Sequence, residues 1–139
     1  GQVVFSQFEA EGFRAVLERA RAQSSPIYLV EQALLGADHS ELGAMLSERW
    51  QLPSEVSDAI RAHHIPPSRP GRNRVRDCVF VANLLSGRMY EPQNGPPAMP
   101  EADLPAWVFR DFGGDFDAIL LHLDGVEDEV TLATEMLRM

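Results

Sequence analysis

Three histidines in the first half of the chain have the residue type and spacing of transition-metal ligands. His39 begins one apolar helical segment, and His63 and His64 end the next. The short "QLP" turn between the segments predicts an antiparallel helix pair, which brings the start of one helix to the end of the other. Three imidazoles would then converge, which is a reasonable start on a metal site. The alternative is that each is an ordinary half-buried histidine, bonded to backbone or to a carboxylate.

Helical periodicity places all three histidines toward the core. Within about 40° of His39 on its helix lie the residues of an expected buried stripe, which are Gly43, Leu46 and Trp50. On the next helix Val56 and Ile60 mark the inward face, and His63 and His64 straddle it. Asp38 lies beside the site, but it is expected to cap the helix, with Glu41 completing a capping-box-like pair.

The elements that carry these residues are predicted to be helices. Only "QVVF" at the start suggests a strand, because apolar residues elsewhere recur at helical spacing. Predicted helices cover about Ser6 to Ala22, Pro26 to Gly36 after a Ser25 cap, 38–50, 53–64 and 75–85, with shorter ones near Trp107, over 119–123 and up to Met139. The helix over 75–85 is apolar nearly all round and is expected to be central and buried. A long Pro/Gly-rich loop follows it. The expected fold class is all-α, a compact single-domain helical bundle.

Composition excludes several classes of function. The 139 residues suit one domain, and a net charge of −9 argues against general nucleic-acid binding. All 12 basic residues are arginines, so there is no Schiff-base or phosphate-loop lysine. We find no signal peptide and no run long enough to span a membrane. We therefore expect a cytoplasmic protein without membrane contact.

Two further features involve arginine and cysteine. Arg69, Arg72, Arg74 and Arg76 form the basic cluster of the chain. Such a cluster is either a solvated surface or a site for an acidic partner or a phosphate ligand. Cys78 lies in the most apolar helix, which predicts an inert core thiol.

Residues 30–66, "VEQALLGADHSELGAMLSERWQLPSEVSDAIRAHHIP", resemble the signature of the HDOD domain, the HD-related output domain of bacterial signalling proteins. The matching positions are Glu31, Gly36, His39, Gly43, Leu46, Trp50, Leu52, Pro53, Ile60, His63, His64 and Pro66. The resemblance implies a helical fold like that of the HD superfamily. "GQVVF" is similar to the segment that follows the His-Asp dyad in related proteins. Residues 1–139 are therefore expected to be an HDOD-like domain without its N-terminal helices.

In the wider HD superfamily, histidines like His39, His63 and His64 are among the metal ligands, together with the dyad and an Asp on a later helix. This chain has Asn83 where the hydrolases would have that Asp, and it lacks the "GYP" extension. A neutral amide is a poor substitute for a carboxylate ligand. The resemblance thus implies a vestigial metal site and favours a non-catalytic role. No cofactor is expected, with a divalent transition metal as the alternative.

The leading functional hypothesis is a regulatory output module of a two-component or related pathway. It would act through a signalling protein or an attached receiver or output domain. The alternative is a divergent metal-dependent phosphohydrolase or cyclic-dinucleotide phosphodiesterase. A third hypothesis is nucleotide sensing by the four arginines. Apolar surface uncovered by the missing helices predicts self-association into a homo-oligomer, with swapping of the N-terminal segment as one route.

Overall fold

A computed structural model of the chain describes residues 1–89, 105–121, 125–126, 128, 131 and 135–136. The described residues form eight helices and no strand, so the predicted all-α class is confirmed. The chain divides into two compact units, Gly1–Pro100 and Glu101–Met139. Most of the predicted loop after the central helix, and much of the predicted C-terminal helix, lie outside the described residues.

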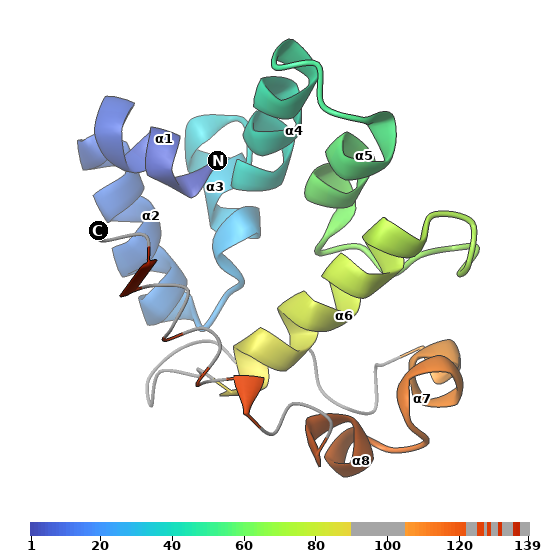
Figure 1. The fold of residues 1–139 in the computed structure, drawn as a ribbon. Coiled ribbons are helices and arrows are strands. Elements are labelled where there is room, and N and C mark those ends of the chain that lie inside the picture. Colours follow the sequence, from blue (N-terminus) through green and yellow to red (C-terminus); the bar gives the residue numbers. More distant parts are fainter. Residues whose placement is uncertain (90–104, 122–124, 127, 129–130, 132–134, 137–139) are drawn as a thin grey trace. The chain divides into compact units, whose positions relative to one another are not determined.

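Figure 1 shows the helices of both units. Their bounds are α1 Gln2–Phe8, α2 Ala10–Gln23, α3 Ile27–Leu35, α4 His39–Arg49, α5 Ser54–Ala62, α6 Arg74–Met89, α7 Ala106–Phe112 and α8 Phe116–Leu121. In the first unit α1 packs on α2, α2 on α3, α3 on α4, α4 on α5 and α5 on α6. Successive helices are therefore neighbours throughout this unit.

The N-terminal segment differs from the prediction. "QVVF" belongs to helix α1 and not to a strand, and the predicted first helix is two helices that meet at Glu9, whose φ of −133° is not helical. The reason is tertiary packing, since Phe5 is buried and stacks on Phe13 of α2 with ring centroids 6.2 Å apart. The break at Glu9 lets α1 fold back on α2.

The ends of α3 and the start of α4 are set by local sequence. Ser25 does not cap α3, because its N–H donates to Ala20 O and closes α2, and Pro26 is the residue before the helix. Gly36 ends α3 with φ of 79°, a left-handed conformation that suits glycine. Asp38 caps α4 as predicted, accepting from the N–H groups of Ser40 and Glu41 at 2.8 and 3.0 Å.

The α4–α5 hairpin brings the predicted metal ligands to one end. Small residues allow the close approach, with Ser40, Ala44 and Ser47 buried on α4 and Ser57 and Ala59 buried on α5. The buried stripe is therefore rotated from the predicted one, and the expectation for Trp50 was wrong: its side chain is 68 % exposed. The reason is that α4 ends at Arg49, and the chain turns immediately afterwards.

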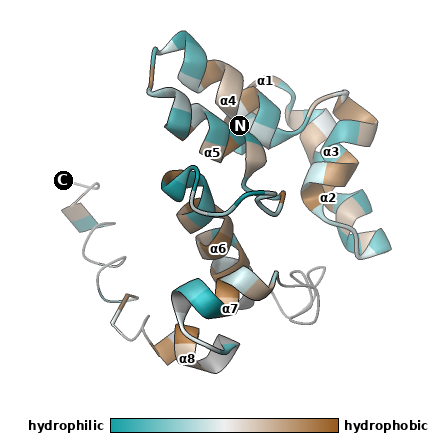
Figure 2. Cartoon of the chain, turned by 90° about the vertical axis from the view of Figure 1, so that its right-hand side faces the viewer, coloured by the Kyte–Doolittle hydropathy of each residue, from teal (hydrophilic) through white to brown (hydrophobic). Residues whose placement is uncertain are grey.

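Helix α6 is buried along one side only. Its core residues are Phe80, Val81, Leu84 and Leu85. Val75, Cys78 and Val79 are exposed, so the predictions of a fully buried helix and a core thiol were wrong. Figure 2 shows the hydropathy of α6 changing from a hydrophilic start to an apolar body. Helix α6 therefore has more apolar residues than it buries against the neighbouring helices.

The second unit contains α7 and α8. Helices α7 and α8 pack against each other, and Trp107, Val108 and Ile119 are buried. Across the described part of both units, no helix has the length and apolar character needed to cross a bilayer.

Candidate functional site

The structure brings His39, His63 and His64 together. His39 Nε2 lies 3.2 Å from His63 Nε2 and 2.9 Å from His64 Nε2. One ligand atom from each ring lies within 4.8 Å of the others. His39 is the first residue of α4, and the two others follow the last turn of α5, so the antiparallel hairpin is what assembles the cluster.

Glu31 of α3 forms two hydrogen bonds to His39. Its Oε2 accepts hydrogen bonds from the backbone N of His39 at 2.9 Å and from Nδ1 of the ring at 2.6 Å. Glu31 is fully buried, and its Oε1 has no hydrogen-bond partner within the described residues. A carboxylate on the far ring nitrogen is the usual partner of a metal-binding histidine, because it fixes the ring and increases its basicity. The sequence resemblance included Glu31 but assigned it no role.

His63 and His64 are oriented through their own Nδ1 atoms. His63 Nδ1 lies 2.7 Å from Ile60 O, and His64 Nδ1 lies 3.3 Å from Nδ2 of Asn83. Tyr28 of α3 stacks on the His64 ring, with centroids 4.4 Å apart and planes at 13°. Tyr28 was not predicted from the sequence, because no spacing rule links it to residue 64.

These contacts determine where the lone pairs point. A carbonyl only accepts, so His63 carries its proton on Nδ1 and has a lone pair on Nε2. His39 donates Nδ1–H to Glu31 and likewise has a lone pair on Nε2. Without a metal, Asn83 donates to His64 Nδ1, and the His64 Nε2–H donates to His39. Binding of a metal by all three Nε2 atoms would need the other His64 tautomer, with its proton on Nδ1. The Nε2 lone pair of His39 then accepts from His64, and the Nε2 lone pair of His63, 3.2 Å from His39 Nε2, has no donor among the three rings.

Burial favours the neutral form of His63 and His64. Desolvation, followed by repulsion from His63 and His39, lowers the pKa of His64 to about 4. Burial also lowers the pKa of His63, although the bond to Ile60 O opposes this. Neutral imidazole is the form that binds metals.

The donor set fits one transition-metal ion. Three imidazole nitrogens are a known ligand set for zinc, which when bound supplies a polarised water in its open position. The cluster contains no carboxylate ligand within the described residues. The side-chain amide of Asn83 lies 3.3 Å from His64 Nδ1 and helps to position that ring. The arrangement therefore fits a single ion and does not fit a two-metal centre.

The predicted arginine cluster is divided by the structure. Arg69, Arg72 and Arg76 line one cleft between the start of α5 and the start of α6, and Arg74 does not. This cleft is built from other residues than the histidine cluster.

An all-α unit with a histidine cluster between paired helices is the arrangement expected for an HD-related domain. Residues 1–66 match the HDOD domain family, which supports the resemblance seen in the sequence. A similar protein is an uncharacterized protein of Treponema pallidum (strain Nichols), 33 % identical over 70 residues, which are 50 % of this chain. The chain covers 14 % of that relative's length. No solved structure gives a significant match.

Proposed function

We propose that the chain is a non-catalytic regulatory module of a bacterial signalling pathway, acting through contact with a signalling protein or an attached domain. The supporting observation is Asn83, whose side-chain amide lies 3.3 Å from His64 Nδ1 where a hydrolase would have a carboxylate. Without anionic ligands, three neutral imidazoles cannot offset the charge of the metal pair that phosphodiester hydrolysis uses. The role of the histidine cluster is then structural, because its contacts join α3, α4, α5 and α6.

Exposed apolar side chains support a role in binding. Met45, Trp50 and Leu52 lie exposed along the α4–α5 hairpin, and tryptophan is among the residues that contribute most to protein interfaces. Their place on the hairpin that carries the histidines would couple a change in the cluster to the contact surface. The partner would be a receiver, output or other signalling domain.

The second candidate is a divergent metal-dependent phosphohydrolase or cyclic-dinucleotide phosphodiesterase. It is favoured by the convergence of the three Nε2 atoms, with Glu31 placed to orient His39. In that case His39, His63 and His64 would hold the ion. The remaining ligands would have to come from elsewhere.

Metal analysis and activity separate the two candidates. The protein is loaded in turn with Fe²⁺, Mn²⁺ and Zn²⁺, and bound metal is measured beside hydrolysis of bis(p-nitrophenyl) phosphate and of cyclic dinucleotides. We expect no hydrolysis above that of a His39→Ala/His63→Ala control. Stoichiometric metal with turnover that this double substitution abolishes would overturn the proposal. The Asn83→Asp variant is the positive comparison, since it should bind metal more tightly than the wild type.

A further inference from the structure

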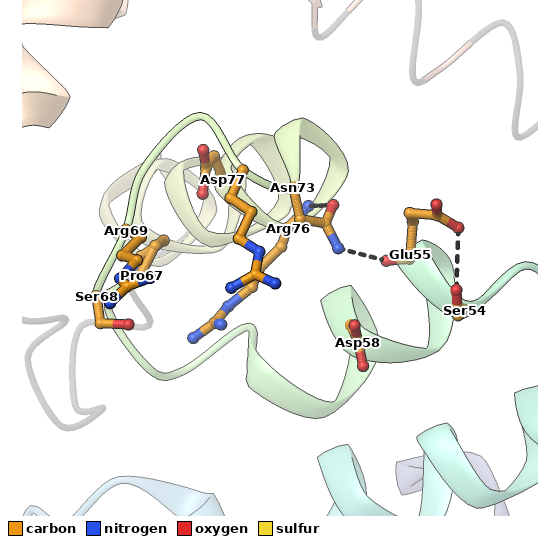
Figure 3. A pocket seen from close by; sticks show the side chains of 10 residues that line it. Ser54, Glu55, Asp58, Pro67, Ser68, Arg69, Asn73, Arg76 and Asp77 are labelled. Atoms are coloured by element: carbon orange, nitrogen blue, oxygen red, sulfur yellow. Dashed lines mark hydrogen bonds between the residues drawn. The ribbon is translucent and has the colours of Figure 1, made fainter.

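A polar cleft lies in the first unit, separate from the histidine cluster. It has a volume of about 710 Å³ and is partly open to solvent. Its lining comes from the start of α5, the loop after the paired histidines and the start of α6, and consists of Ser54, Glu55, Asp58, Pro67, Ser68, Arg69, Arg72, Asn73, Arg76 and Asp77. The volume is in the range of small-molecule sites. Figure 3 shows arginines on the loop and α6 side, with Glu55 and Asp58 on α5 opposite.

The cleft is held in shape by its backbone contacts. Asn73 caps α6 by accepting from the Arg76 N–H at 3.0 Å, and its Nδ2 donates to Glu55 O at 3.2 Å. Asp77 is buried and accepts from the N–H of Gly71 at 2.5 Å, which fixes the loop. These bonds tie α5, the loop and α6 together, so the side chains that line the cleft start from a preorganised frame.

The three cleft arginines keep their hydrogen-bonding capacity. Arg69 and Arg72 are exposed and form no hydrogen bond or ion pair within the described residues. The Nε of Arg76 is buried and has no acceptor within the described residues, and the guanidinium forms one long hydrogen bond there, from Nη2 to Ile65 O at 3.5 Å. A buried guanidinium donor without an acceptor is costly. A ligand with anionic oxygens would accept from the exposed guanidinium groups of Arg69 and Arg72, and guanidinium groups bind phosphate in a two-point geometry.

The three carboxylates of the cleft, Glu55, Asp58 and Asp77, restrict the ligand further. Asp77 and Glu55 bond to Gly71 N and Ser54 Oγ, and neither forms an ion pair with a cleft arginine in the described structure. The charges of the three arginines and three carboxylates cancel. The net electrostatic attraction of the cleft for a simple anion is therefore small. A molecule with a phosphate at one end and amino or hydroxyl donors at the other would match both sides.

We propose that this cleft binds a small phosphorylated molecule, with its phosphate on Arg69, Arg72 and Arg76 and its donor groups toward Glu55 and Asp58. This goes beyond the proposed function, because it adds a ligand site that needs neither a metal nor the histidines. The module would then respond to a soluble phosphate compound as well as to its protein partner.

Calorimetry on the full chain in EDTA tests the site with pyrophosphate, AMP and GMP as probes. We expect saturable binding of at least one nucleotide, tighter than that of pyrophosphate. The Arg69→Ala/Arg72→Ala substitution should weaken it about tenfold or more, the loss expected for one or two charged hydrogen bonds. Both residues are exposed, so this variant should keep its fold, which thermal unfolding checks.

Arg74→Ala is the matched control, because Arg74 lies in the same cluster, is exposed and is outside the cleft lining. The affinity of this variant for the nucleotide should lie within about twofold of that of the wild type. Equal losses in both variants would overturn the proposal, since they would indicate nonspecific attraction. If no heat of binding appears at about 10 mM probe, which corresponds to the weakest useful affinity, the proposal is also overturned. The same holds if a phosphoserine peptide binds and the free phosphate compounds do not. Because the calorimetry is done in EDTA, failure of ligand binding here leaves the metal and hydrolysis test of the proposed function unaffected.

Discussion

At the scale of single residues, Glu31 determines the geometry of the histidine cluster. It is a fully buried carboxylate with two bonds to His39. Glu31→Ala leaves the His39 N–H and ring without a buried acceptor, and it should lower the free energy of unfolding by about 3 kcal/mol. Chemical denaturation measures this. The control is Glu48→Ala, which removes a solvent-exposed ion pair with Arg61 and should cost less than about 1 kcal/mol. Equal losses would contradict the assignment.

The same cluster predicts how stability depends on pH in the metal-free protein. Burial lowers the pKa of His64 to about 4, with His63 and His39 lowering it further and Asp38 opposing them. In the unfolded chain a histidine titrates near 6.5. Between pH 6.5 and 4 the unfolded state therefore binds more protons than the folded state, and stability falls as the pH falls.

Chemical denaturation in EDTA at pH 7 and at pH 5 measures this effect. Most carboxylates titrate below pH 5, so they contribute little to the difference. His64→Gln should lose less stability across that interval than the wild type, because glutamine does not titrate. An unchanged or larger loss in the variant would show that other groups cause the pH dependence.

At the scale of elements, the α4–α5 hairpin depends on a close approach at Gly43. A Cβ at this position would lie 2.9 Å from Ile60 Cγ2, on a β-branched side chain with few rotamers. Gly43→Ala should therefore lower stability by about 1 kcal/mol despite the better helix propensity of alanine. The control is Gly12→Ala, where the contact is the flexible tip of Leu35 and the expected change is neutral or stabilising. Thermal unfolding of both variants measures the difference, and similar behaviour would contradict it.

The elements also indicate how far local rules extend. The Asp38 cap and the Gly36 end of α3 follow from side-chain chemistry within four residues, and both were predictable. The break at Glu9 was not, since it depends on Phe5 reaching Phe13 across the break. Trp50 was misplaced for a related reason: periodicity is informative only while the helix continues, and α4 ends one residue earlier.

At the scale of the whole molecule, exposed apolar surface predicts self-association. Phe8 is 80 % exposed and Val3 is 67 % exposed, both on α1. We expect light scattering to report a concentration-dependent oligomer, and Phe8→Ser to shift it toward monomer by removing buried apolar area. Leu121→Ser is the control, because Leu121 is also exposed but lies in the other unit. A monomer at high concentration would contradict the prediction.

The sequence by itself determined the helical class, the Asp38 cap, the HDOD signature and the pairing of His39 with His63 and His64. These depend on periodicity and on short separations along the chain, which helix geometry converts directly into positions. Only the tertiary structure decided that Glu31 and Tyr28 of α3 hold two of the imidazoles, and that the cleft includes three of the four clustered arginines. Those contacts join different helices, and their relative rotation depends on how side chains pack between them.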